Sequence, residues 1–145
     1  MVVLTIPIET TLRLFSGKRP NDLGVTNGRL KPAPNSPNAV SSQAQDPGHA
    51  IAPLLYNRTR DQAMQALVKI IESTPRTRIV TRTQDYVYAE YTSAVMGFVD
   101  DVEFYFEPGS QTIQVRSASR LGYRDFGVNR ARIEDIRRWL AASGA

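Results

Sequence analysis

The stretch that decides the fold is GFVDDVEFYFEPGSQTIQVRSASRLGYRDFGVNRARIEDIR, residues 97–137. Apolar and polar side chains alternate within Phe98 to Glu107 and within Thr112 to Ala118, and a Pro-Gly pair lies between these two runs. Alternation with a period of two predicts strands, and the short turn between the runs predicts an antiparallel hairpin.

A polar run from Val115 to Ile133, which we call the hinge, overlaps the second strand. It contains five arginines, two serines and two glycines between apolar residues. This composition predicts the end of a buried strand, a tight connection and the capped start of a helix. Asn129 is the predicted cap of that helix, Arg130 to Ala142, because asparagine is favoured at such positions.

The sequence before residue 97 predicts one more helix and two more strands. Thr59 and Gln62 have the spacing of a capping box, and the apolar residues that follow repeat at helical spacing, which predicts a helix from Asp61 to Ser73. Strands are predicted from Arg78 to Arg82 and from Tyr86 to Thr92. The order α-β-β-β-β-α predicts an α+β fold, a four-stranded antiparallel sheet with two helices on one face.

The chain of 145 residues has the length of one domain. We predict a leader over residues 1–22 and a single domain over residues 23–145. Residues 23–56 are rich in proline, asparagine and serine, with scattered aliphatic residues, and are predicted to form an extended arm wrapped on the domain. The first fifteen residues, MVVLTIPIETTLRLF, lack a basic start and a long apolar run, so we expect neither a signal peptide nor a membrane span.

The net charge of +4 is concentrated near the C-terminus. Residues 116–138 hold seven arginines and three acidic residues, so this segment carries the whole excess and the rest of the chain is neutral. A guanidinium group suits bidentate pairing with a carboxylate or a phosphate. The charge therefore predicts either pairing inside the fold or an anionic partner, although codon bias would also favour arginine over lysine.

Several kinds of site are excluded or disfavoured by composition. The chain has no cysteine, which excludes disulfides, thiolate metal sites and cysteine nucleophiles and permits a cytoplasmic location. His49 is the only histidine, too few for a usual metal site, so we predict no metal and no cofactor. Gly122 and Gly127 lack the spacing of phosphate-binding loops, and no RNA-binding signature is present, so nucleic acid is not an expected partner.

Asp100 is an anomaly in the predicted hairpin. It falls on the apolar face of its strand with Val102 and Phe104, where a carboxylate needs a hydrogen-bonding partner. Ser117, Ser119 or an arginine of the hinge is the expected partner. One hypothesis is a structural latch between Asp100 and an arginine. The other is a catalytic acid that works with Arg116 or Arg120 in a cleft between arm and sheet.

Four pieces of the chain, residues 24–44, 75–80, 86–93 and 97–137, resemble the domain-of-unknown-function 1499 family. The family has bacterial, cyanobacterial and plant plastid members, so the resemblance implies a link to photosynthetic membranes but carries no known activity or catalytic residue. Relatives carry two cysteines in the arm where this chain has Ala33 and Ala39. A function shared with them therefore cannot depend on thiols.

These observations predict a small binding or assembly module that docks an anionic partner, which is an acidic protein surface, a lipid headgroup or a phosphorylated ligand. The alternative is a small hydrolase- or isomerase-like enzyme that uses Asp100 and a nearby arginine. The sequence leaves open the oligomeric state, the ligand and whether there is catalysis. The predicted binding residues are Arg116, Ser117, Ser119, Arg120, Asp125, Asn129 and Arg132.

Overall fold

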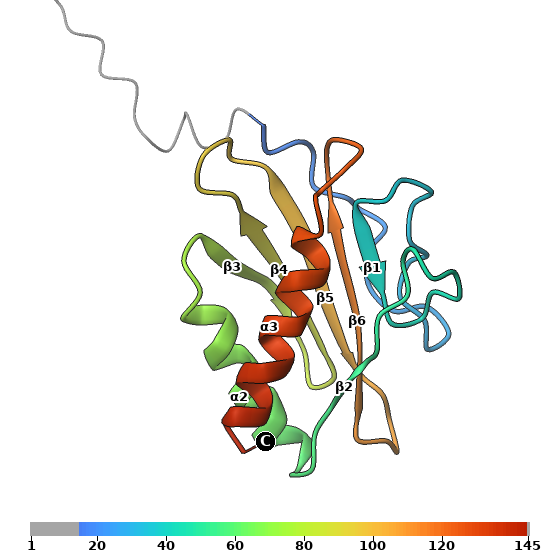
Figure 1. Ribbon diagram of the computed structural model, residues 1–145. Coiled ribbons are helices and arrows are strands. Elements are labelled where there is room, and N and C mark those ends of the chain that lie inside the picture. Colours follow the sequence, from blue (N-terminus) through green and yellow to red (C-terminus); the bar gives the residue numbers. More distant parts are fainter. Residues whose placement is uncertain (1–14, 145) are drawn as a thin grey trace, which may run out of the picture.

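The computed structural model describes residues 15–144, which form one sheet with two helices packed against it (Figure 1). The helices are α2 (Arg60–Glu72) and α3 (Val128–Ala142). The strands are β1 (Ala39–Ser41), β2 (Leu54–Leu55), β3 (Thr77–Arg82), β4 (Tyr86–Thr92), β5 (Val99–Phe106) and β6 (Thr112–Ser119). The fold is α+β, as predicted. The prediction of neither signal peptide nor membrane span falls mostly on residues 1–14, which lie outside the described residues.

The sheet is antiparallel, with the order β1-β6-β5-β4-β3, and β2 also pairs with β6. The prediction of four strands was therefore wrong: β3 to β6 are present, and the arm adds β1 and β2 to the outer edge of β6. The added strands are three and two residues long. Such short segments, flanked by prolines, give no period-two signal in the sequence.

Both helices cover the same face of the sheet and enclose the main core (Figure 1). Helix α2 begins with the predicted capping box, in which Thr59 and Gln62 exchange hydrogen bonds with each other's backbone amides. Burial of large apolar side chains is the main stabilising contribution in such a layer. Fully buried members of the core include Leu67, Ile71, Val102, Phe104, Phe106, Ile113, Ile133, Ile136 and Leu140.

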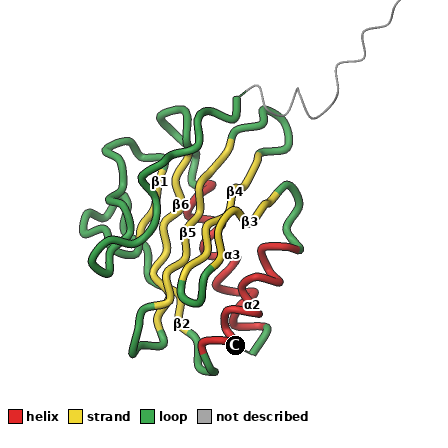
Figure 2. The backbone as a smooth tube through the Cα atoms, turned by 180° about the vertical axis from the view of Figure 1, so that it is seen from behind, coloured by secondary structure: helices red, strands yellow, loops and turns green. Residues whose placement is uncertain are grey.

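The arm covers part of the second face of the sheet, over β6 and β5. Figure 2 shows this side, where irregular arm segments rather than helices lie beside these strands, and β3 is left uncovered. The amide of Gly24 donates to Glu103 on β5, and Arg116 on β6 donates to the carbonyl of Pro32. Every residue of β5 is buried as a result. Asp101 and Glu103, which alternate with the core residues, thus lie beneath the arm rather than in solvent.

The start of α3 differs from the prediction. The helix begins at Val128, and Asn129 lies inside its first turn, fully buried, so the predicted Asn129 cap was wrong. Asp125 supplies the acceptor instead, because its carboxylate receives hydrogen bonds from the amides of Gly127 at 3.0 Å and Asn129 at 3.1 Å. Phe126 and Gly127 both have positive φ, 53° and 81°, and the tight turn brings Asp125 within reach. Within residues 15–144, neither helix is long and apolar enough to cross a membrane.

Candidate functional site

The predicted binding residues lie on both faces of the sheet and form two clusters, not one site. Successive residues of β6 point to opposite faces. The helix-side cluster consists of Tyr91, Asp100, Ser117, Ser119, Asp125, Asn129 and Arg132. The arm-side cluster consists of Arg19, Tyr86, Tyr88, Glu90, Asp101, Glu103, Arg116 and Arg120.

Arg132 is the partner of Asp100 in the helix-side cluster. Its Nη2 donates to Asp100 Oδ2 at 2.6 Å, and its Nη1 donates to Ser117 Oγ at 3.0 Å and to Asn129 Oδ1 at 2.7 Å. The guanidinium also lies over the ring of Tyr91, 4.7 Å from its centroid. Helix α3 is thereby bonded to two central strands. Arg116 and Arg120, the arginines considered as catalytic partners of Asp100, contact carboxylates on the opposite face of the sheet.

Asn129 connects the arm, β6 and the hinge to α3. Its Nδ2 donates to the carbonyl of Asn38 at 3.1 Å, to Ser119 Oγ at 2.9 Å and to Asp125 Oδ2 at 2.9 Å. Its Oδ1 accepts a hydrogen bond from Ser117 Oγ at 2.5 Å. A buried amide with this many partners fixes the relative position of the segments that it joins.

Two pKa shifts in the helix-side cluster follow from these contacts. Burial acts to raise the pKa of Asp125, but the hydrogen bonds from Asn129 and from the amide of Gly127 outweigh it and hold that pKa below its ordinary value. Burial raises the pKa of Tyr91 to about 12, and its hydroxyl has no hydrogen-bond partner. The cluster at neutral pH therefore combines an ionised Asp125 with a protonated Tyr91.

Arg120 organises one half of the arm-side cluster. Its Nη2 lies 2.8 Å from Asp101 Oδ1 and also contacts Glu90. Arg19, which precedes the arm, donates from its Nη2 to Glu90 Oε1 at 2.7 Å, and Tyr88 donates to Asp101 Oδ1 at 2.5 Å. Burial acts to raise the pKa of Glu90, but hydrogen bonds from Arg19 and Arg120 outweigh it and lower that pKa.

Glu103 and Arg116 form the other half and lie directly opposite each other in the β5–β6 register. Glu103 Oε1 accepts hydrogen bonds from Tyr86 at 2.7 Å and from the amide of Gly24 at 2.8 Å. Arg116 Nη1 lies 3.8 Å from Glu103 Oε2, and neither that oxygen nor Arg116 Nε has a hydrogen-bond partner. Burial therefore raises the pKa of Glu103 and lowers the pKa of Arg116.

Most of the arginines between residues 116 and 138 make hydrogen bonds or ion pairs within the molecule. Beyond the arginines of the two clusters, Arg130 donates to the carbonyl of Ala50, and Arg137 donates to the carbonyl of Pro53. Arg138 pairs with Asp135. Of the seven arginines between residues 116 and 138 in the described part of the chain, Arg124 alone has neither a hydrogen bond nor an ion pair, and it lies 5.8 Å from the ring centroid of Tyr123.

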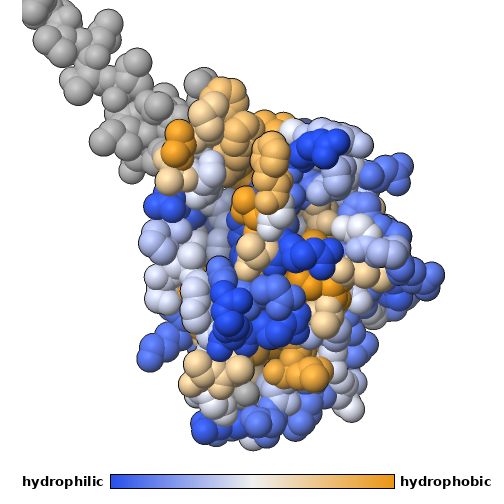
Figure 3. Space-filling model, in the orientation of Figure 1, coloured by the Kyte–Doolittle hydropathy of each residue, from blue (hydrophilic) through white to orange (hydrophobic). Residues whose placement is uncertain are grey.

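Arg124 lies at the end of the sheet that carries several exposed apolar residues, which we call the apolar pole. They come from the β4–β5 connection and from the hinge, two segments that leave the same end of the sheet (Figure 1). Figure 3 shows apolar side chains gathered at this end of the molecule. Phe126 is 94% exposed and Val95 is 86% exposed. The apolar pole consists of Val95, Met96, Leu121, Tyr123, Phe126 and Val128.

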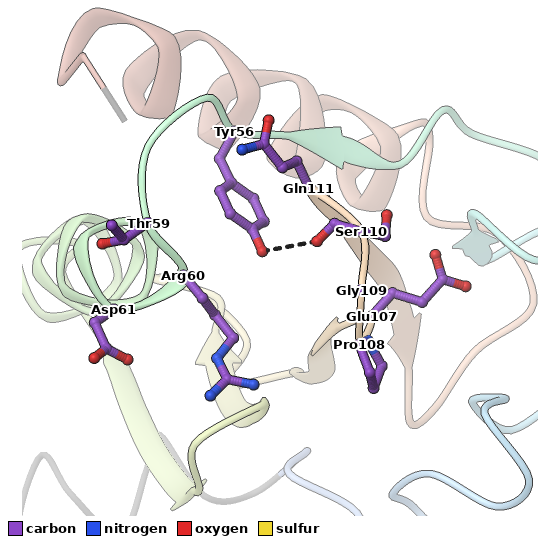
Figure 4. Close-up of a pocket in the computed structure, with 9 residues that line it drawn as sticks. All are labelled: Tyr56, Thr59, Arg60, Asp61, Glu107, Pro108, Gly109, Ser110 and Gln111. Atoms are coloured by element: carbon purple, nitrogen blue, oxygen red, sulfur yellow. Dashed lines mark hydrogen bonds between the residues drawn. The ribbon is translucent and has the colours of Figure 1, made fainter.

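A cavity of about 470 Å³ lies at the opposite end, between the start of α2 and the β5–β6 turn (Figure 4). Tyr56 closes one side, and its hydroxyl donates to the carbonyl of Ser110 at 3.1 Å. None of the predicted site residues lines this cavity. Within residues 15–144, no group of three histidine, cysteine or acidic side chains is arranged to hold a metal ion. The cavity is lined by Tyr56, Thr59, Arg60, Asp61, Glu107, Pro108, Gly109, Ser110 and Gln111.

Comparison with known families identifies the chain. The family described as "Protein of unknown function (DUF1499)" matches residues 29–140. The chain belongs to the DUF1499 family. No curated protein and no solved structure matches it. The DUF1499 match includes β1 to β6, the hinge and most of α3, whereas Arg19 and Gly24, which close the arm-side cluster, precede it.

Proposed function

We propose that this DUF1499 protein is a non-enzymatic docking module that binds an anionic partner with its apolar pole. The observation that carries the proposal is the exposure of six apolar side chains at the end of the sheet where Arg124 lies, a residue without a hydrogen bond or an ion pair. Contiguous exposed apolar residues mark interaction surfaces in soluble proteins. A free cation beside them attracts an anionic partner and gives the association a salt dependence.

The paired arginines are not the docking groups in this proposal. Arg116, Arg120 and Arg132 are largely buried and already bind carboxylates. The cations available at the apolar pole are Arg124 and Lys18. Lys18 is exposed, and it follows Gly17, whose backbone packs so closely on Leu121 that a Cβ at Gly17 would lie 3.1 Å from Leu121 Cγ.

The alternative, a hydrolase- or isomerase-like enzyme that uses Asp100, gains no support from the described contacts. Asp100 is held by Arg132, and the cavity of about 470 Å³ lies at the other end of the molecule. The docking proposal includes a location in the cytoplasm, at the periphery of a membrane.

The test is the association of the tagged full chain with a cell extract at low and high salt, after separation into membrane and soluble fractions. Phe126→Ser and Val95→Ser together should abolish the association, and high salt should weaken it. Leu55→Ser is the matched control, because Leu55 is 70% exposed on β2, away from the apolar pole. Association of the Phe126→Ser, Val95→Ser variant at the wild-type level would overturn the proposal.

A further inference from the structure

Resting on the proposed docking function, we infer that the anionic partner is a lipid bilayer. Phe126 and Val95 insert between the lipids, while Arg124 and Lys18 bind headgroup phosphates. The shape of the apolar pole is the first reason. Its residues sit on the two connections that leave one end of the sheet and on the first residue of α3 (Figure 1), and the two most exposed of them, Val95 and Phe126, are 86% and 94% exposed.

A protein partner and a bilayer make different demands on such a surface. A stable protein interface needs about 800 Å² from each partner and close shape complementarity. The apolar pole offers only six apolar residues, two of which are almost completely exposed. A fluid bilayer adapts to protruding side chains and gains from each apolar group that enters it. The apolar pole therefore suits a bilayer better than it suits a protein surface.

The backbone of Phe126 is the second reason. Its φ of 53° lies in the left-handed region, which glycine and asparagine adopt far more readily than phenylalanine. The ring is 94% exposed, so packing within the fold does not account for an aromatic residue there. The turn that brings Asp125 to the first amides of α3 needs a left-handed residue at this position but not a phenylalanine, and non-glycine residues in this region cluster at functional sites.

The chemistry around Phe126 also suits the boundary between lipid tails and headgroups. Tyr123 is amphipathic, as residues at membrane interfaces are, and Arg124 beside it offers the fork that binds phosphate oxygens. Asp125, the only acidic residue in residues 93–98 and 120–128, is bonded to the amides of Gly127 and Asn129. The apolar pole thus presents cations without a competing free carboxylate.

A pair of stacked aromatic rings lies at the same end of the molecule. Phe15 stacks on Phe98 with ring centroids 5.3 Å apart, and Phe98 ends the β4–β5 connection that carries Val95. Both rings are half-buried, so they add apolar surface beside the apolar pole.

The test is co-sedimentation of the full chain with phosphatidylcholine vesicles, with and without added phosphatidylglycerol. We expect binding that requires phosphatidylglycerol and falls at high salt. Phe126→Ser should weaken it about 10- to 100-fold, the loss that corresponds to one large apolar side chain. Arg124→Gln should weaken it about fivefold. Leu55→Ser should bind as the wild type does, and thermal unfolding of Phe126→Ser at or above the wild-type temperature shows that the fold is intact.

The other outcomes separate this inference from the proposed function. Equal binding to vesicles without phosphatidylglycerol would overturn the inference of headgroup recognition. Absence of vesicle binding, together with association in the soluble fraction that Phe126→Ser abolishes, would overturn the bilayer and leave the docking function standing. Unchanged behaviour of Phe126→Ser in both experiments would overturn both.

Discussion

Replacing Asp100 by alanine should unfold the protein at a lower temperature, because the substitution leaves Arg132 without its carboxylate. Breaking a buried ion pair by removing one partner costs about 3–5 kcal/mol. The Asp100 and Arg132 side chains are 11% and 14% exposed, so partial solvation places the expected loss near the lower limit, about 3 kcal/mol. For a chain of this length about 2–4 °C is lost per kcal/mol, so the melting temperature should fall by about 6–12 °C.

A double-mutant cycle with Arg132→Ala makes the prediction specific to the pair. Arg132→Ala also removes hydrogen bonds to Ser117 and Asn129 and the contact with Tyr91, so it should destabilise more than Asp100→Ala does. Once Arg132 is absent, Asp100 has lost its ion-pair partner. The double variant should therefore be less destabilised than the two single losses added together, by about 1–3 kcal/mol.

Two assays are used on the wild type and on the three variants: urea denaturation gives the unfolding free energy, and thermal unfolding gives the melting temperature. Both are followed by circular dichroism and analysed as two-state transitions. Asp100→Asn is the matched control, because asparagine keeps an oxygen that accepts a hydrogen bond from Arg132 and should lose only about 1 kcal/mol. A wild-type melting temperature for Asp100→Ala, or additive losses in the cycle, would refute the latch. A stable Asp100→Asn variant that lost a measurable turnover would support the enzyme alternative instead.

Three further predictions concern single residues. The hydrogen bond of His49 with the carbonyl of Ser36, together with the contact with Asp46, raises the pKa of its ring above 6.5. The stabilisation by protonated His49 is complete below the ordinary pKa of histidine, about 6.5, and is lost as the pH rises through the pKa of His49 in the folded protein. His49→Gln should therefore destabilise the protein more at about pH 6 than at about pH 8 in urea denaturation. Equal losses at the two pH values would contradict a raised pKa of His49. A Cβ at Gly127 would have no atom within 4 Å, but the φ of 81° is unfavourable for alanine. Gly127→Ala should therefore lower the unfolding free energy by about 1–2 kcal/mol through backbone strain alone. An unchanged midpoint of urea denaturation would show that the turn relaxes. Phe126→Asn should raise the unfolding free energy by up to about 1 kcal/mol, because asparagine tolerates the left-handed region; a clear loss of stability would mean that the ring packs in the fold.

The central strands and the helices could be predicted because their signals are local. Strand β4 runs from Tyr86 to Thr92 as predicted, and α2 begins at its capping box. The strands β1 and β2 could not be predicted, since segments this short become strands only when a partner strand is already in place. The prediction that Asn129 caps α3 was wrong, because the turn at Phe126 and Gly127 brings the carboxylate of Asp125 to the first amides of the helix.

The pairs of charged residues were partly within reach of the sequence. Alternation places Asp100 on the core face, but its partnership with Arg132 depends on how α3 crosses the sheet, which no local pattern encodes. The pair of Glu103 and Arg116 is different, because these residues face each other in a hairpin whose turn is marked by Pro108 and Gly109. Register counted from that turn would have predicted the pair.

The hinge reverses the usual distribution of residue types between interior and surface. It buries arginines in pairs with Asp100, Asp101 and Glu103, although replacing a buried ion pair with well-packed apolar residues is often neutral or stabilising. The same segment leaves Phe126 and Tyr123 in water, where burial would have stabilised the fold. Neither the buried ion pairs nor the exposed aromatic side chains are explained by the stability of the isolated chain. Both are consistent with a rigid base, held by directional ion pairs, that presents apolar side chains to a partner which covers them.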